Sequence, residues 1–91
     1  MSTISRTVRI AASHGLHARP AKLFAQAAKD AGIPVTIAKG DGAPVNASSI
    51  LAVIALGANT GDEVTLQAEG EGAQAVVDQL AALLETDQDA Q

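Results

Sequence analysis

The stretch "EVTLQAEGEGAQAVVDQLAALLE", residues 63–85, changes its hydrophobic period from two residues to about 3.6. In residues 63–69, Val64 and Leu66 alternate with polar side chains, which predicts a strand with one buried side. The stretch that follows predicts a helix, one face of which carries Ala73, Val76, Val77, Leu80, Leu83 and Leu84. A one-sided strand and a one-sided helix each need an apolar partner layer, so this stretch indicates a fold in which helices pack on a sheet.

Three further strands are predicted upstream. Residues 3–11 alternate, with Ile4, Val8 and Ile10 on the same side as Arg6. Residues 35–38 and 43–46 alternate around Gly40-Asp41-Gly42, which predicts a hairpin whose turn takes positive φ angles. Pro44 places the second strand of this hairpin at a sheet edge.

Two further helices are predicted between these strands. Pro20 suits the first turn of a helix whose apolar stripe is Ala21, Phe24, Ala25 and Ala28. Gly32 and Pro34 end that helix.

Residues 46–57 fit a short helix or a buried strand, and their alanines favour the helix. Asn46 or Ser48 could cap it, and Gly57 could end it.

The element order is therefore strand-helix-strand-strand-helix-strand-helix (βαββαβα). We expect an α+β fold, a two-layer open-faced sandwich with a four-stranded antiparallel sheet and three helices on one face. The 91 residues are enough for a single domain, 1–91, in which residues 86–91 form a flexible tail.

The composition excludes several classes of function. Phe24 is the only aromatic residue, which argues against stacking on nucleic-acid bases, and cysteine is absent, which excludes disulfides and thiolate metal sites. No apolar run approaches the ~20 residues that span a bilayer. The first residues also lack the apolar core of a signal peptide, so we expect a cytoplasmic protein without direct membrane insertion.

Charge is distributed unevenly along the chain. Residues 1–45 contain all six bases and two acids, a net charge of +4, whereas residues 46–91 contain eight acids and no base, a net charge of −8. This asymmetry indicates electrostatically distinct surfaces, although solubility alone explains it about as well.

The segment "SHGLHARPAKLF", residues 13–24, places cations at the start of a predicted helix. The unpaired N–H groups of a helix start make that end positive, so Arg19 and Lys22 are unfavourable there unless an anion binds. His17 lies at or beside the N-cap, where a phosphoryl group would meet backbone N–H donors and the Arg19 guanidinium together.

The motif "GLHARPA", Gly15 to Ala21, followed by Phe24, resembles the active-site segment of the HPr family. These are the histidine-containing phosphocarriers of the bacterial phosphoenolpyruvate:sugar phosphotransferase system, and the resemblance extends over about residues 4–85. It implies that His17 is phosphorylated on Nδ1 by Enzyme I and passes the group to sugar-specific EIIA domains. It also implies that Arg19 neutralises the phosphoryl group and that Gly15, Ala18 and Pro20 support the active site.

The resemblance further implies a regulatory phosphorylation site and a docking surface. Ser49 matches the serine that a regulatory kinase phosphorylates in some bacteria, although a serine at a helix start is also an ordinary cap. Ile50, Leu51 and Ile54 match positions that contact partners in the family. Lys22 and Lys29 are further partner-binding candidates, because they could steer this basic face onto an acidic partner, although a solvated helix face explains the two lysines about as well. We expect the three apolar residues to be exposed, whereas Val53 and Leu56 belong to the core.

A monomeric carrier that needs no cofactor or metal and is not an independent enzyme fits these features. One alternative is a regulatory HPr-like module, but regulatory paralogues lack the active histidine, and His17 is present. A second alternative is a carrier in a nitrogen-linked branch of the same relay. A zinc site on His14 and His17 would lack a third ligand nearby in sequence.

We predict that the pKa of the His17 imidazole lies below the reference of about 6.5, because a positive helix end disfavours the imidazolium. The lowered pKa keeps a ring lone pair free for attack on phosphorus. An NMR titration of the ring measures this value, and a pKa clearly above the reference would contradict the predicted position of His17 at the helix start.

Overall fold

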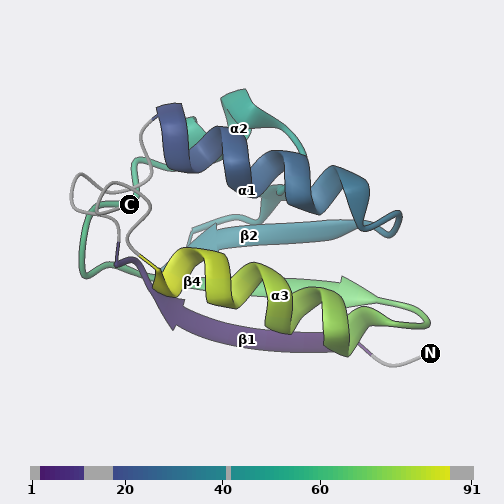
Figure 1. Ribbon diagram of the computed structural model, residues 1–91. Coiled ribbons are helices and arrows are strands. Elements are labelled where there is room, and N and C mark those ends of the chain that lie inside the picture. The colour runs from purple at the N-terminus through teal and green to yellow at the C-terminus, as the bar shows by residue number, and fades with distance from the viewer. Residues whose placement is uncertain (1–2, 12–17, 41, 87–91) are drawn as a thin grey trace.

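Four strands form one antiparallel sheet in the computed structural model, which describes residues 3–11, 18–40 and 42–86. The strands are β1 (Thr3–Arg9), β2 (Val35–Lys39), β3 (Val45–Asn46) and β4 (Glu63–Glu69). Their order in the sheet is β1-β4-β2-β3, so β4 pairs with both β1 and β2 (Figure 1). The predicted sheet is confirmed, and β3 lies at its edge as Pro44 indicated.

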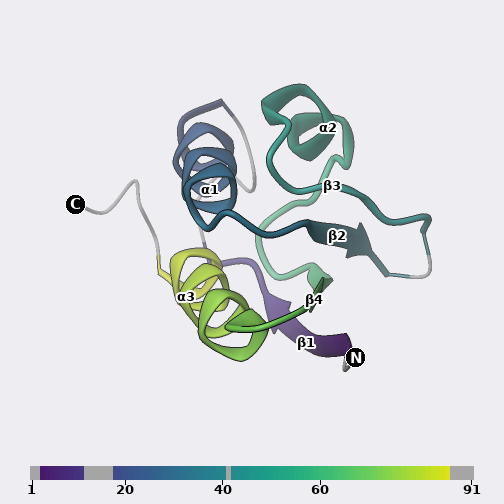
Figure 2. The ribbon, with the colours of Figure 1, turned by 90° about the vertical axis from the view of Figure 1, so that its right-hand side faces the viewer.

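Three helices within the described residues cover one face of this sheet: α1 (Ala18–Asp30), α2 (Ile50–Ala55) and α3 (Ala73–Glu85). Figure 2, seen along the helices, shows all three on the same side of the strands. The predicted open-faced sandwich with the order βαββαβα is therefore confirmed.

The core lies between the two layers and is built from the periodic positions. The predicted stripe of α1 is buried, and so are the inward residues Val64 and Leu66 of β4. In α3 the prediction was incomplete, because Ala81 is also buried while Val76 and Leu83 are only partly buried. The described core side chains are aliphatic except for Phe24.

The opposite face of the sheet is polar. Thr7 and Thr65 face each other across β1 and β4 with their hydroxyl oxygens 3.0 Å apart, and the Thr3 hydroxyl donates to the Glu69 carboxylate at 3.0 Å. These side chains hydrogen-bond to one another, so this face needs no apolar cover.

Arg6 lies on the helix side of β1, as its alternation with the strand's outward residues predicted. Its guanidinium forms ion pairs with Asp78 at 3.0 Å and Glu85 at 3.5 Å, both on α3. Two α3 carboxylates thus hold one cation of the sheet against that helix.

The hairpin turn differs from the prediction in one respect. Gly40 has a φ of +52°, as expected, whereas the φ of Gly42 is not positive. A Cβ on Gly42 would lie 3.0 Å from the Lys39 carbonyl oxygen, so close backbone approach favours glycine there. The return strand β3 begins at Val45, two residues later than predicted.

The central helix was predicted too long and with the wrong cap. Six residues form α2, and its N-cap is Ser49, whose side chain accepts a hydrogen bond from the Ala52 amide at 3.3 Å. The Asn46 side chain instead accepts hydrogen bonds from the Ser48 amide and hydroxyl. Gly57, with a φ of +66°, follows the helix end as predicted.

Beyond α3, the Thr86 hydroxyl donates to the Ala82 carbonyl at 2.8 Å, and residues 87–91 lie outside the described residues. The single domain 1–91 with a flexible tail stays a prediction.

We predict that Leu80→Ala lowers the free energy of unfolding by about 2–5 kcal/mol, because truncating a buried leucine loses contacts and leaves a cavity. Leu80 is 1% exposed in α3, whereas Leu51, the matched control, is 80% exposed in α2. Leu51→Ala should change stability by no more than about 0.5 kcal/mol. Urea unfolding measures both, and equal losses would contradict this account of the core.

Candidate functional site

The candidate site is built on the first turn of α1. The helix begins at Ala18, and Pro20 lies in its first turn, where the missing N–H costs no hydrogen bond. Pro20 is buried and anchors the turn, while Ala18 and Arg19 are exposed. Residues 12–17, which include Gly15 and His17, lie outside the described residues.

The start of α1 has the electrostatic character that its sequence predicts. No acidic residue lies in the first turn, so no carboxylate of that turn neutralises its positive end. Arg19 is the second residue of the helix, and Lys22 begins the second turn rather than lying in the first. An anion at this helix end would face amide donors and the Arg19 guanidinium.

The cations on the strands of the sheet are neutralised. Arg6 pairs with α3 carboxylates, Arg9 lies 3.9 Å from Glu63, and Lys39 lies 3.6 Å from Asp62. These ion pairs involve three of the chain's six bases.

The other three cations, Arg19, Lys22 and Lys29, all lie exposed on α1. None of them forms an ion pair within the described part of the chain. The net positive charge of the first half of the sequence therefore concentrates, in space, on the outer surface of α1.

Beside α1, the short helix α2 exposes three large apolar side chains, which we call the α2 patch: Ile50, Leu51 and Ile54. Their exposed fractions are 42%, 80% and 38%. Val53 is fully buried, and Leu56 is partly buried against the core. The predicted division of α2 into an exposed side and a core side is thus what the structure shows.

A depression of about 310 Å³ lies between α1 and α2. Lys29 borders it from α1, and Ser49, Ile50 and Leu51 border it from α2. The structure therefore brings one predicted docking cation next to the predicted regulatory serine and part of the α2 patch. Lys29 also lies in the last turn of α1, where a cation is favourable in any helix.

One exposed apolar residue was missed by the sequence reasoning. Leu23 on α1 is 43% exposed and borders a second depression, which lies between α1 and α3. The signal was available, because Leu23 falls outside the stripe formed by Ala21, Phe24, Ala25 and Ala28.

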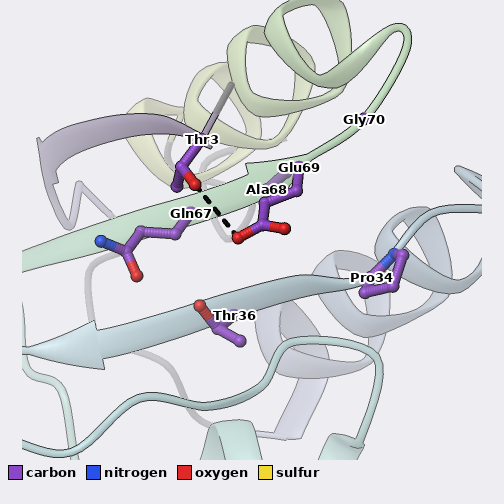
Figure 3. A pocket seen from close by; sticks show the side chains of 7 residues that line it. All are labelled: Thr3, Pro34, Thr36, Gln67, Ala68, Glu69 and Gly70. Atoms are coloured by element: carbon purple, nitrogen blue, oxygen red, sulfur yellow. Dashed lines mark hydrogen bonds between the residues drawn. The ribbon is translucent and has the colours of Figure 1, made fainter. Parts of the chain in front are cut away.

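A hollow of about 420 Å³ lies on the polar face of the sheet, beside the C-terminal end of β4 (Figure 3). Thr3, Thr36, Gln67 and Glu69 line it, and Figure 3 shows the Glu69 carboxylate turned toward Thr3. A carboxylate and the lack of any lining cation make this hollow unsuited to a phosphoryl group.

The residues that the structure describes contain no group of three or more His, Asp or Glu side chains able to hold a metal ion. His14 and His17 lie outside them. Among the same residues, no helix has the length and hydrophobicity that crossing a bilayer requires.

Comparison with known proteins identifies the chain's class as phosphoryl-group carriers. The family model described as "PTS HPr component phosphorylation site" matches residues 4–86. The chain belongs to the HPr family, the phosphocarriers of the phosphotransferase system.

Two relatives and one solved structure match this chain along most of their length. The phosphocarrier protein HPr of Streptomyces coelicolor is 53% identical over 87% of this chain and 85% of that protein. The HPr-like protein Crh of Bacillus subtilis is 42% identical over 90% of this chain and 95% of its own length. A crystal structure of HPr from Bacillus anthracis superposes with a TM-score of 0.86 at 36% identity, covering 92% of this chain and 99% of that one.

The function expected from the sequence is thereby confirmed at the level of the family. The chain is a phosphocarrier of the phosphotransferase system, a member of a phosphoryl relay and not a standalone enzyme. Membership in the family also implies Enzyme I and EIIA domains as the partners of such a relay.

Proposed function

We propose that His17 is the residue on which this phosphocarrier holds the phosphoryl group. The start of α1 carries the proposal, because it presents Arg19 without a neutralising acid, two residues after the histidine of the "GLHARPA" motif. In the first transfer, a lone pair of the neutral imidazole forms an N–P bond as the bond between phosphorus and Enzyme I breaks. In the second, the N–P bond breaks as an EIIA domain takes the group for sugar uptake.

Arg19 neutralises the phosphoryl oxygens during both transfers. Its exposed position suits this role, because no acidic partner among the described residues has to be displaced when the phosphate arrives. A guanidinium can donate two parallel hydrogen bonds to phosphoryl oxygens, which an ammonium cannot do in the same fixed geometry. Gly15, Ala18 and Pro20 shape the backbone around His17.

The α2 patch is the docking surface of this proposal. Three exposed apolar side chains on one short helix fit the buried centre of a transient interface, and Lys22 and Lys29 add charge that attracts an acidic partner. Enzyme I and the EIIA domains would use the same surface in turn. The proposed carrier is a cytoplasmic monomer, which leaves this surface free for each partner.

Ser49 is the proposed regulatory site, although its capping bond to Ala52 already accounts for a serine there. A phosphate on Ser49 would add negative charge beside the α2 patch and weaken docking of an acidic partner. The alternatives for the chain as a whole are a regulatory HPr-like module and a carrier of a nitrogen-linked branch, and the presence of both His17 and Arg19 favours the carrier.

Incubation with phosphoenolpyruvate and Enzyme I should add one acid-labile phosphate to the wild-type protein, detected by intact-mass analysis. His17→Ala should remain unmodified, because it lacks the accepting nitrogen. Phosphate on His17→Ala would place the acceptor elsewhere. No phosphate on the wild type, with Enzyme I shown to be active on another carrier, would favour the regulatory alternative.

Arg19→Ala and Leu51→Ala should affect different kinetic constants of the transfer from Enzyme I. Loss of the charge-assisted hydrogen bonds at Arg19 should lower kcat about tenfold or more. Loss of the apolar contact at Leu51 should raise KM about fivefold or more with kcat unchanged. Arg9→Ala, which removes an arginine from β1, is the control. An unchanged kcat in Arg19→Ala would remove that residue from the mechanism.

A further inference from the structure

Lys39 reaches from the sheet to the C-terminal end of α2. Val35 and Ile37 of β2 are buried under the helices, and the alternation of the strand places Lys39 on that same side. Its ammonium donates a hydrogen bond to the Gly57 carbonyl at 3.1 Å. Gly57 follows directly on the C-cap of α2, so the cation lies at the negative end of that helix.

The same ammonium is held by a carboxylate that closes the next turn of the chain. Lys39 Nζ lies 3.6 Å from Asp62 Oδ2, and that oxygen accepts a hydrogen bond from the Asn59 amide at 2.9 Å. The Asp62 amide in turn donates to the Asn59 carbonyl at 3.0 Å. Lys39 therefore joins the end of α2 to the turn that leads into β4.

This turn is also joined to the end of β1. The Ile10 amide donates to the Asp62 carbonyl at 2.9 Å, and the Gly61 amide donates to the Ile10 carbonyl at 2.9 Å. The segment that contains His17 follows Ile10 in the sequence. One side chain, Lys39, thus connects α2 with the turn before β4, to which Ile10 at the end of β1 is hydrogen-bonded.

The helix α2 needs such support because it is short. Isolated helices below about 12 residues are marginal in water, and α2 has six residues, of which Val53 alone is buried. Ser49 caps its N-terminal end, but its last turn contains no basic residue. The cation at its C-terminal end comes from β2, far away in the sequence.

We propose that Lys39 is a positioning residue for docking: it fixes α2, and with it the α2 patch, without itself touching the partner. The inference rests on the proposed function, in which Enzyme I binds the α2 patch. Lys39 would then do more than form a surface ion pair with Asp62: it would also hold α2 in place.

The test compares Lys39→Met, which keeps the length of the side chain but removes its charge, with Lys39→Arg, which keeps the cation. Arg9→Met is the matched control, because it removes the same charge from an ion pair on the open face of the sheet. Two quantities are measured for each: amide hydrogen exchange in the free protein, and the Kd of the unphosphorylated protein for Enzyme I.

In Lys39→Met, the Leu56 and Gly57 amides, which donate within the last turn of α2, should exchange about two- to fivefold faster. The Kd for Enzyme I should rise by about the same factor. Lys39→Arg should restore both values toward the wild type. Arg9→Met should leave both unchanged.

Unchanged exchange at α2 or an unchanged Kd in Lys39→Met would overturn the inference, and so would an equal rise of the Kd in Arg9→Met. Failure of the proposed function is seen separately. A wild type that binds Enzyme I but takes no phosphate contradicts the role of His17 and leaves the Lys39 comparison valid. A wild type that does not bind Enzyme I contradicts the docking surface and this inference together.

Discussion

One-sided burial of the sheet is the constraint on which the rest of the structure depends. The central strand β4 buries Val64, Leu66 and Ala68 on one side and hydrogen-bonds its polar side chains across the other. All three described helices must therefore lie on the same face, since only that face offers apolar surface. In a domain of this size, their outer surfaces then carry the exposed groups that remain for function: the start of α1, its row of cations, and the apolar side of α2.

The elements that depend on local periodicity were predictable from the sequence. The bounds of β4 and the buried stripe of α1 agree with the alternation and the helical spacing because a half-buried element repeats its own pattern. The prediction of α2 failed at its start, where the side chains compete for hydrogen bonds. The alanines of residues 46–57 could not show that Asn46 binds Ser48 and leaves Ser49 as the cap, whereas Gly57 marked the end of the helix correctly. The exposure of Leu23 follows from its place outside the buried stripe of α1, so helical spacing was enough to predict it.

The candidate site shows the same division. Pro20 in the first turn and the exposure of Leu51 follow from helix geometry and from the limited surface that six residues can bury. The distribution of charge needs the tertiary structure. The sequence shows a basic first half, but only the sheet register and the packing of α3 reveal that Arg6, Arg9 and Lys39 are paired with acids that come later in the chain. The three cations that remain without a described acidic partner all lie on one helix, α1. The structure therefore places the positive charge on one surface, which the charge count of the sequence does not show.

A carrier must release its phosphoryl group as readily as it accepts it, and this sets a limit on how strongly the site can hold an anion. Exposed charges are screened by water and salt, so Arg19 at the surface of α1 contributes a modest attraction that an incoming partner can overcome. A buried cage of several cations would hold the group more tightly and slow the second transfer. Because the phosphoryl site binds its anion only moderately, another surface of the molecule must provide selectivity between partners. The α2 patch offers apolar contact beside the row of cations, so a short helix whose ends are fixed by Ser49 and Lys39 can supply the selectivity that the phosphate site lacks.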